Sequence, residues 1–163
     1  MAHGEPPRQV ALALVTVSDT RTEADDESGS LARRLVESAG HRVVRYRIVP
    51  DEPERIRPEV CALVADLECE AIVLTGGTGV AARDRTCEAL ADLWDTPLPG
   101  FGELFRMLSF DSVGSRAMLS RATGGIVGGK PIFALPGSPR AVELALGRLI
   151  LPELGHLLAE LRK

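Results

Sequence analysis

The residues of this sequence that are best suited to chemistry are a glycine-rich loop and two aspartates. The loop comprises Thr75, Gly76, Gly77, Thr78 and Gly79. Glycines lack a Cβ atom, so their backbone N–H groups can approach an anion closely, and Thr78 adds a hydroxyl donor. The loop therefore predicts either a phosphate-binding site or a tight turn without a ligand. It is neither a Walker loop nor a dinucleotide fingerprint, because the Gly-Lys-Ser/Thr ending and the G-x-G-x-x-G spacing are both absent.

Two acidic residues, Asp51 and Asp84, are expected close to this loop. A carboxylate beside bound phosphate is unfavourable unless a cation bridges the two groups, as Mg²⁺ does with oxygen ligands. Each residue also has a simpler interpretation. Asp51 could cap the following helix, and Asp84 could be a solvated loop residue paired with Arg83 or Arg85. The presence of both acids on neighbouring strand ends favours a metal site.

Alternating strands and helices are predicted to position these residues. Continuous apolar runs predict buried strands at 10–17, 71–75 and 131–135, and a less buried strand is predicted at 42–49. Helical patterns separate them, and Ser138 followed by Pro139 marks a helix start. The predicted fold class is α/β, a single domain over residues 1–163 with a mainly parallel sheet and helices on both faces.

Four segments should meet at one edge of this sheet, because the carboxyl ends of parallel strands lie together and form the usual ligand crevice. The segments begin at Ser18, Asp51, Thr75 and Pro136. In the last of them, Gly137 allows close approach to the edge, while Ser138 is already explained as a helix cap. Considered as isolated residues, Ser109 and Ser120 favour a structural role.

Composition limits the classes of partner. A net charge of −4 and a pI near 5.4 give no bulk attraction to nucleic acid or to an anionic membrane surface. Cys61, Cys69 and Cys87 lack the spacing of a disulfide framework or a zinc site, which favours a reducing compartment. Residues 1–9 lack the features of a secretory signal, and no apolar run approaches the roughly 18 residues of a membrane span. We therefore expect a cytoplasmic protein that binds neither nucleic acid nor membrane.

Six motifs together carry a family resemblance. The sequence resembles the MoaB/MogA family of molybdenum-cofactor biosynthesis proteins, which is related to the gephyrin N-terminal domain. The motifs run in the family's order over nearly the whole chain. They are VSDTR…DESG (17–29), VPDE (49–52), TGGTGVAARDRTCEA (75–89), PGFGELFRMLSF (99–110), LSRATGG (119–125) and LPGSPRAVE (135–143).

The resemblance implies a three-layer α/β/α sandwich that assembles as a homotrimer or, in some members, a homohexamer. It also implies that the ligand is molybdopterin, a pterin with a dithiolene and a terminal phosphate. In the adenylyltransferase members, MgATP supplies an AMP group to that phosphate. This step prepares molybdopterin for molybdate insertion, which makes a downstream molybdate-inserting protein a possible partner.

The resemblance also implies roles for individual residues. Asp51 and Asp84 align with the metal-handling catalytic pair of active members, and Ser109 and Ser120 align with contacts to the molybdopterin phosphate. The family's glycine loop corresponds to residues 75–79, and its PGS loop supplies Gly137 and Ser138.

Two motifs differ in the branch that they resemble. FRMLSF is similar to the MoaB branch and ARDRT to the MogA branch, and Cys87 replaces the proline that the family usually has. Two functions follow, a molybdopterin adenylyltransferase or a non-catalytic molybdopterin-binding or carrier protein. The acid pair favours the enzyme, since a protein that only binds the pterin has little use for Asp84.

Overall fold

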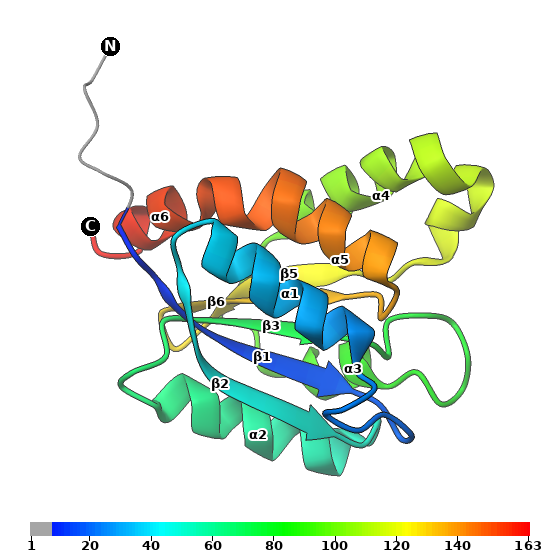
Figure 1. The fold of residues 1–163 in the computed structure, drawn as a ribbon, viewed down its shortest axis with the longest axis horizontal. Coiled ribbons are helices and arrows are strands. Elements are labelled where there is room, and N and C mark those ends of the chain that lie inside the picture. The colour runs from blue at the N-terminus through cyan, green and yellow to red at the C-terminus, as the bar shows by residue number, and fades with distance from the viewer. Residues whose placement is uncertain (1–7) are drawn as a thin grey trace.

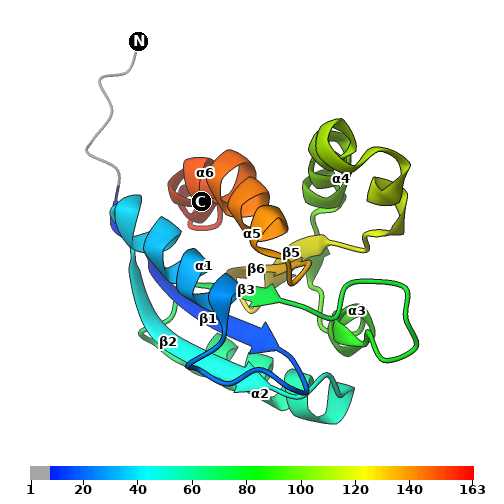
Figure 2. The ribbon, with the colours of Figure 1, turned by 45° about the vertical axis from the view of Figure 1, so that its right-hand side comes forward.

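A six-stranded sheet lies between two layers of helices in the computed structural model, which describes residues 8–163 (Figures 1 and 2). The strands are β1 Ala11–Val17, β2 Arg42–Val49, β3 Ala71–Thr75, β4 Thr96–Pro97, β5 Thr123–Val127 and β6 Lys130–Leu135. Residues 1–7, and with them most of the segment predicted to lack a secretory signal, lie outside the described range.

The strand order β2-β1-β3-β6-β5-β4 confirms a mainly parallel sheet. Strands β2, β1, β3 and β6 are parallel, whereas β5 and β4 are antiparallel to their neighbours. After β1 the chain adds β2 on one side and then returns to add β3 on the other. This reversal beside β1 is the topological switch point at which α/β sheets usually bind ligands.

The helices form two layers, one on each face of the sheet (Figure 2). The layer above the sheet in Figure 1 holds α1 Glu27–Ser38, α4 Pro99–Val113, α5 Pro139–Ala145 and α6 Leu151–Glu160. The opposite layer holds α2 Pro53–Ala65 and α3 Thr86–Leu90. A 3₁₀ segment, η1 Gly114–Leu119, follows α4, and a π-helical segment, η2 Leu146–Ile150, joins α5 to α6.

Burial on both faces explains the unbroken apolar run of β1. Leu12 and Leu14 pack in the core beneath α1, α4, α5 and α6, whereas Ala13 and Val15 pack in the core above α2 and α3. Successive strand residues point to opposite faces, so a strand covered on both faces needs apolar residues at every position. Within residues 8–163, the helices are too short or too polar to cross a membrane.

Candidate functional site

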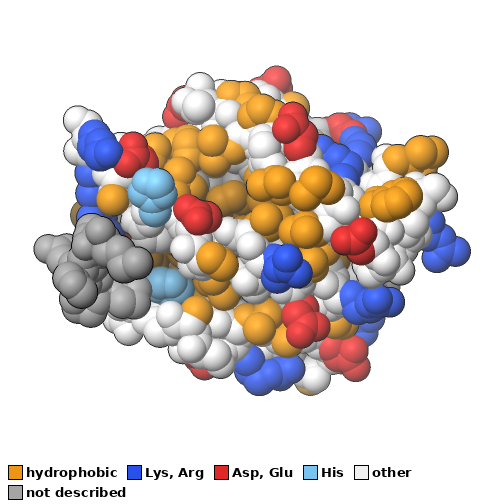
Figure 3. Space-filling view, turned by 90° about the horizontal axis from the view of Figure 1, so that it is seen from above, with side chains coloured by type: hydrophobic (Ala, Val, Ile, Leu, Met, Phe, Trp, Pro, Cys, Tyr) orange, Lys and Arg blue, Asp and Glu red, His pale blue; other side chains and the backbone are white. Residues whose placement is uncertain are grey.

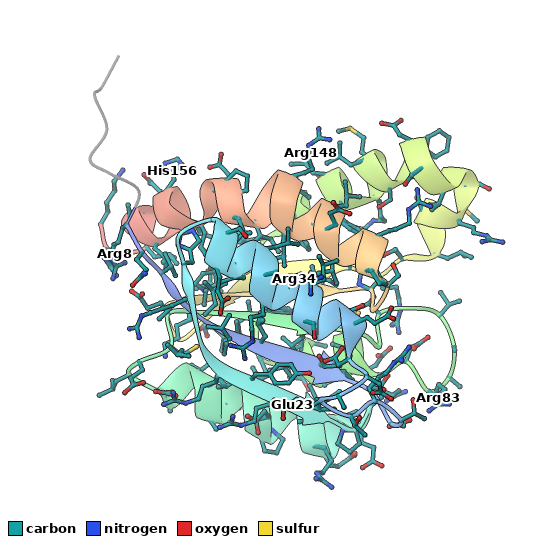
Figure 4. All side chains as sticks on the ribbon, viewed as in Figure 1. Arg8, Glu23, Arg34, Arg83, Arg148 and His156 are labelled. Carbon is teal, nitrogen blue, oxygen red and sulfur yellow. The ribbon has the colours of Figure 1, made fainter. Side chains whose placement is uncertain are left out.

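Loops that follow four parallel strands meet at one edge of the sheet, the edge near Arg83 in Figure 4. A cleft of about 290 Å³ lies there, and its lining includes Ser18, Thr75, Gly76, Gly137 and Ser138. Gly76 and Gly137 are in close contact, since a Cβ added at Gly137 would lie 3.4 Å from the Gly76 Cα. Three of the four segments that the sequence placed at this edge thus line the cleft, whereas Asp51 of the fourth lies against Gly77 and does not line it.

The glycine loop adopts a conformation that side chains would obstruct. Gly76 and Gly77 have φ values of 101° and 69°, in the left-handed region. A Cβ at Gly76 would lie 2.3 Å from the Val17 carbonyl oxygen, and one at Gly77 would lie 2.6 Å from Oδ2 of Asp51. The absence of a side chain at Gly77 therefore lets the Asp51 carboxylate sit directly against the loop backbone.

The side chains of the two loop threonines and of Ser18 are less available to a ligand than the sequence suggested. Thr75 and Thr78 are buried, at 4% and 2% exposure, so their side chains face the interior more than the cleft. The Ser18 hydroxyl accepts hydrogen bonds from the backbone N–H groups of Thr20 at 3.2 Å and Arg21 at 3.0 Å. Ser18 therefore shapes its own turn while it lines the cleft.

Asp51 and Asp84 both lie against the glycine loop. Oδ1 of Asp51 accepts a hydrogen bond from the Arg85 backbone N–H at 2.9 Å. Oδ2 of Asp84 accepts one from the Ala81 backbone N–H at 3.0 Å and would lie 2.7 Å from a Cβ added at Gly79. Each carboxylate keeps one oxygen that makes no hydrogen bond within residues 8–163.

Neither of the simpler interpretations of the two acids describes their contacts. The N-cap of α2 is Glu52, and the Asp51 side chain bonds to Arg85 instead of capping the helix. Arg83 pairs with Asp19, and within residues 8–163 Asp84 forms no ion pair with Arg83 or Arg85. The alternatives of a capping Asp51 and an Arg-paired Asp84 are therefore wrong.

The electrostatic environment of the acid pair favours a cation. Burial raises the pKa of Asp51, and the negative charges of Asp84 and Asp19 raise it further, against the opposing effect of the Arg85 N–H. Within residues 8–163, no group of three or more His, Cys, Asp or Glu side chains is arranged to hold a metal. Two carboxylates do fit Mg²⁺ that arrives with phosphate and water ligands, which is how that ion is commonly bound.

A second and larger pocket, of about 630 Å³, lies between α4–η1 and α5–η2 and is lined by Ser109, Ser120 and Ser138. Ser109 is buried, and its hydroxyl makes no hydrogen bond within residues 8–163. The Ser120 hydroxyl accepts the Ala122 N–H at 3.3 Å, and the Ser138 hydroxyl caps α5 by accepting the Ala141 N–H at 3.2 Å. Ser138 lines both pockets, which makes them neighbours.

Sequence reasoning missed three arginines of the larger pocket, Arg116, Arg140 and Arg148. They are exposed, and within residues 8–163 none of them takes part in an ion pair. Figure 4 shows Arg148 on the helical layer above the sheet. No short motif contains all three, because only the packing of α4–η1 beside α5–η2 brings them together. The lining also contains the carboxylate of Glu143, so three guanidinium groups against one acid leave the pocket positively charged, which suits an anionic ligand.

Cys87, which replaces the proline usual in the family, lies in the first turn of α3 as predicted. Its thiol donates a hydrogen bond to the Arg121 carbonyl oxygen at 3.1 Å. Burial raises the pKa of this thiol, so it is a packing group and not an activated nucleophile.

Comparison with known proteins places this arrangement in a family. Residues 13–156 match the family described as a probable molybdopterin binding domain. The chain belongs to this molybdopterin-binding family, in its MoaB/MogA group. It is 48% identical to molybdenum cofactor biosynthesis protein B of Halalkalibacterium halodurans, an alignment that covers 98% of this chain and 94% of the relative.

Two solved structures are similar over their whole length. A crystal structure of a molybdenum cofactor biosynthesis protein B matches with a TM-score of 0.94 and 48% identity, and covers 97% of this chain and 99% of that one. The tungsten cofactor synthesizing protein MoaB from Pyrococcus furiosus matches with a TM-score of 0.85 and 36% identity, and covers 97% and 100%. The resemblance in sequence and the predicted sandwich fold are both confirmed.

Proposed function

We propose that this protein binds molybdopterin and uses MgATP to transfer AMP to its terminal phosphate. The observation that carries the proposal is the placement of Asp51 and Asp84 against a glycine loop whose Gly76 lines the smaller cleft. That cleft shares Ser138 with the larger, arginine-lined pocket. Relatives named molybdenum cofactor biosynthesis protein B support the pathway. The adenylylated pterin would then pass to a molybdate-inserting protein.

Molybdopterin would occupy the larger pocket. Its terminal phosphate is an anion, and guanidinium groups form strong, paired hydrogen bonds with phosphate oxygens. Arg116, Arg140 and Arg148 supply those groups, and the hydroxyl of Ser109 is free to donate. Ser120 lies on the same wall of the pocket, where it would contact the phosphate as the family resemblance implies.

ATP would occupy the smaller cleft, with its phosphates beside Gly76 and Gly77. Backbone N–H groups of such a loop bind anions because no Cβ atom obstructs them. Mg²⁺ carried by ATP supplies neutralisation of phosphate charge, and the free oxygens of Asp51 and Asp84 would hold it in place. The two carboxylates would therefore position the nucleotide through its cation.

In the reaction an oxygen of the molybdopterin phosphate attacks the α-phosphorus of ATP, and the bond to pyrophosphate breaks. The attacking oxygen is already ionised near neutral pH, so no side chain has to remove a proton. The protein's contribution is to hold the two phosphates in line and to stabilise charge. This requirement is consistent with a site made of glycines, carboxylates, serines and arginines.

A non-catalytic molybdopterin-binding or carrier protein is the alternative. One observation favours it, namely that the name of the 48% identical relative specifies a pathway and no reaction. Such a protein would need the larger pocket but not the acid pair.

Adenylyl transfer by the purified protein distinguishes the two functions. The protein would be mixed with molybdopterin, MgATP and pyrophosphatase, and the adenylylated pterin would be measured by mass spectrometry. Asp51→Asn and Asp84→Asn should lose most of the rate and still bind molybdopterin. Asp92→Asn, at an exposed position beyond α3, is the matched control and should keep the wild-type rate. Tight pterin binding without AMP transfer would establish the carrier function.

We also propose that the protein is a homo-oligomer whose copies meet through α4 and η1. Apolar side chains gather over the middle of the helical layer that Figure 3 shows. On α4 and η1, Met107, Phe110 and Met118 are 59%, 61% and 79% exposed. Sedimentation should give a trimer or hexamer for the wild type, and Phe110→Asp should dissociate it; a monomeric wild type would contradict the proposal.

A further inference from the structure

Arg121 donates three hydrogen bonds to the acid-bearing loop, the segment of residues 78–85 that contains Asp84. It lies between η1 and the start of β5, directly after Ser120 of the larger pocket. Its Nε donates to the Gly79 carbonyl oxygen at 2.8 Å, and its Nη2 donates to the Asp84 carbonyl oxygen at 3.0 Å. Its backbone N–H also donates to the Thr78 carbonyl oxygen at 2.9 Å. One residue thus holds the loop at its beginning and at Asp84.

Glu88 fixes the direction of this guanidinium. Nη1 of Arg121 donates to Oε1 of Glu88 at 2.5 Å, and the positive charge lowers the pKa of Glu88. The carboxylate in turn raises the pKa of Arg121. Because the fork of a guanidinium is planar and rigid, a bond to Glu88 on one side orients the remaining donors toward Gly79 and Asp84.

The loop has few other contacts. Residues 80–83 are exposed, and the turn bond between Ala81 and Asp84 is internal to the loop. The side chain of Arg83 pairs with Asp19, but this contact does not involve the backbone of Asp84. Beyond Asp84, the Arg85 N–H bonds to Asp51. The contacts of Arg121 are therefore the main connection between the Asp84 backbone and the rest of the protein.

The segment that bears Arg121 is itself held from the other side. Nη1 of Arg106, on α4, donates to the carbonyl oxygens of Ser120 at 3.3 Å and Ala122 at 2.9 Å. Residues 120–122 therefore form a short connecting segment, which Arg106 holds through two carbonyl oxygens and which we call the bridge. One side of the bridge faces the larger pocket through Ser120, and the other side holds the acid-bearing loop through Arg121.

We infer that Arg121 is a positioning residue that sets the place of Asp84 relative to Asp51 and to the larger pocket. The expected effect of Arg121 on AMP transfer rests on the proposed function. The expected effect on the position of the loop is independent of it, because the hydrogen bonds form without either substrate. Small errors in the placement of reacting groups can cost about 100-fold in rate, so losing this contact should affect transfer strongly.

Hydrogen exchange, followed by mass spectrometry, tests the inference without any substrate. Arg121→Gln should increase exchange of the backbone amides in residues 78–85 by about tenfold or more, since fewer bonds oppose local opening. Exchange in β1 and β3 should stay unchanged. Arg45→Gln is the control, because Arg45 also bonds to two acids and a carbonyl, but on β2 away from the site.

Transfer assays then measure the catalytic consequence. Arg121→Gln should bind molybdopterin within about twofold of the wild type, need more Mg²⁺ for half-maximal rate, and transfer AMP about 10- to 100-fold more slowly. Arg121→Lys should recover only part of the rate, because an ammonium cannot reach both carbonyl oxygens as a planar fork does. Glu88→Gln, which keeps the side-chain shape, should loosen the loop less than Arg121→Gln.

The two proposals can fail separately. If the wild type transfers no AMP, the proposed function is wrong, and the exchange comparison still decides the role of Arg121. Wild-type exchange in residues 78–85 of Arg121→Gln would overturn the inference, as would an equal increase throughout the chain. Should Arg121→Gln not fold, Arg121→Lys and Glu88→Gln must show the same confined increase, and its absence from both would overturn it.

Discussion

Asp19 ties the ends of two strands together through the backbone of Asp51. Its Oδ1 accepts a hydrogen bond from the Asp51 N–H at 2.8 Å, and its Oδ2 pairs with Arg83. Both contacts lower the pKa of Asp19, so it stays ionised. Asp19 thus fixes the backbone at Asp51 and holds a residue next to Asp84, although the sequence assigned it no role of its own.

Replacing Asp19 should therefore weaken the acid pair indirectly. Asp19→Ala removes the acceptor for the Asp51 N–H and the partner of Arg83, and we expect AMP transfer to fall about tenfold, in line with a small displacement of reacting groups. Asp19→Asn keeps an oxygen acceptor and should retain more of the rate. Initial rates at saturating molybdopterin measure both, and an Asp19→Ala rate equal to the wild type would contradict the role.

Asp51→Asn should stabilise the fold while it removes most of the AMP-transfer rate. Burial and two neighbouring acids raise the pKa of Asp51 above its value of 3.8 in the unfolded chain. Between pH 3.8 and this raised pKa the folded state binds more protons than the unfolded chain, so stability falls as the pH rises and Asp51 ionises. A neutral amide of the same shape removes that cost, and we expect a Tm increase of about 1–2 °C at pH 7.

The comparison variant for this effect is Asp92→Asn, whose carboxylate is exposed beyond α3. Its Tm should stay at the wild-type value. A lower Tm for Asp51→Asn would mean that the ionised carboxylate is needed for the fold, and the electrostatic description of the acid pair would be wrong.

His41 should make stability fall in mildly acidic solution. Its Nδ1 accepts a hydrogen bond from the Val10 N–H at 3.1 Å, and burial lowers its pKa below the usual 6.5. Between that lowered pKa and about 6.5 the unfolded chain binds more protons, so stability rises with pH and is lost as pH falls. Urea unfolding from pH 5 to 8 should show a slope of at most about 1.4 kcal/mol per pH unit.

The slope should disappear in His41→Gln and persist in His156→Gln. His156 is exposed on α6, where its ring approaches the carboxylates of Glu153 and Glu160. If the slope survived in His41→Gln, another group would be responsible for it.

The larger pocket should bind molybdopterin through its arginines. Arg116→Gln, Arg140→Gln and Arg148→Gln should each weaken binding about 3- to 10-fold, because each removes a charged hydrogen-bond donor from an exposed site. The loss should shrink as salt increases. Fluorescence titration with the pterin measures it, and Arg55→Gln, an exposed arginine on the opposite helical layer, controls for net charge. If Arg55→Gln weakened molybdopterin binding equally, the three pocket arginines would have no specific role in it.

The predictable parts of the fold were those decided by local sequence. The apolar run of β1 and the Ser138-Pro139 helix start each depend on neighbouring residues, and both were predicted. The N-cap of α1 was not predicted: Asp26 accepts the local Gly29 N–H at 2.9 Å and also a hydrogen bond from the Thr16 hydroxyl of β1 at 2.6 Å. Only the folded chain shows that second contact.

The residues of the candidate site were likewise predictable only where the local sequence and the strand order determine their position. Asp51, Asp84 and the glycine loop were recognisable because strand ends in a parallel sheet converge. Arg121 was not, since its acceptors are 33 to 42 residues distant along the chain. Strand β4 was missed too, because two residues give no periodic pattern and their partners, Ile126 and Gly125, are about 30 residues distant along the chain.

The two edges of the sheet also limit how copies of the chain can aggregate. One edge is β2, which carries Arg42, Arg45 and Arg47, and the other is β4, which has two residues and ends in Pro97. Charged side chains along one edge, of which Arg45 and Arg47 are ion-paired, and a proline without an N–H at the other both discourage another strand from docking edge to edge. Fibre-like growth through backbone pairing is therefore disfavoured at both margins of the sheet.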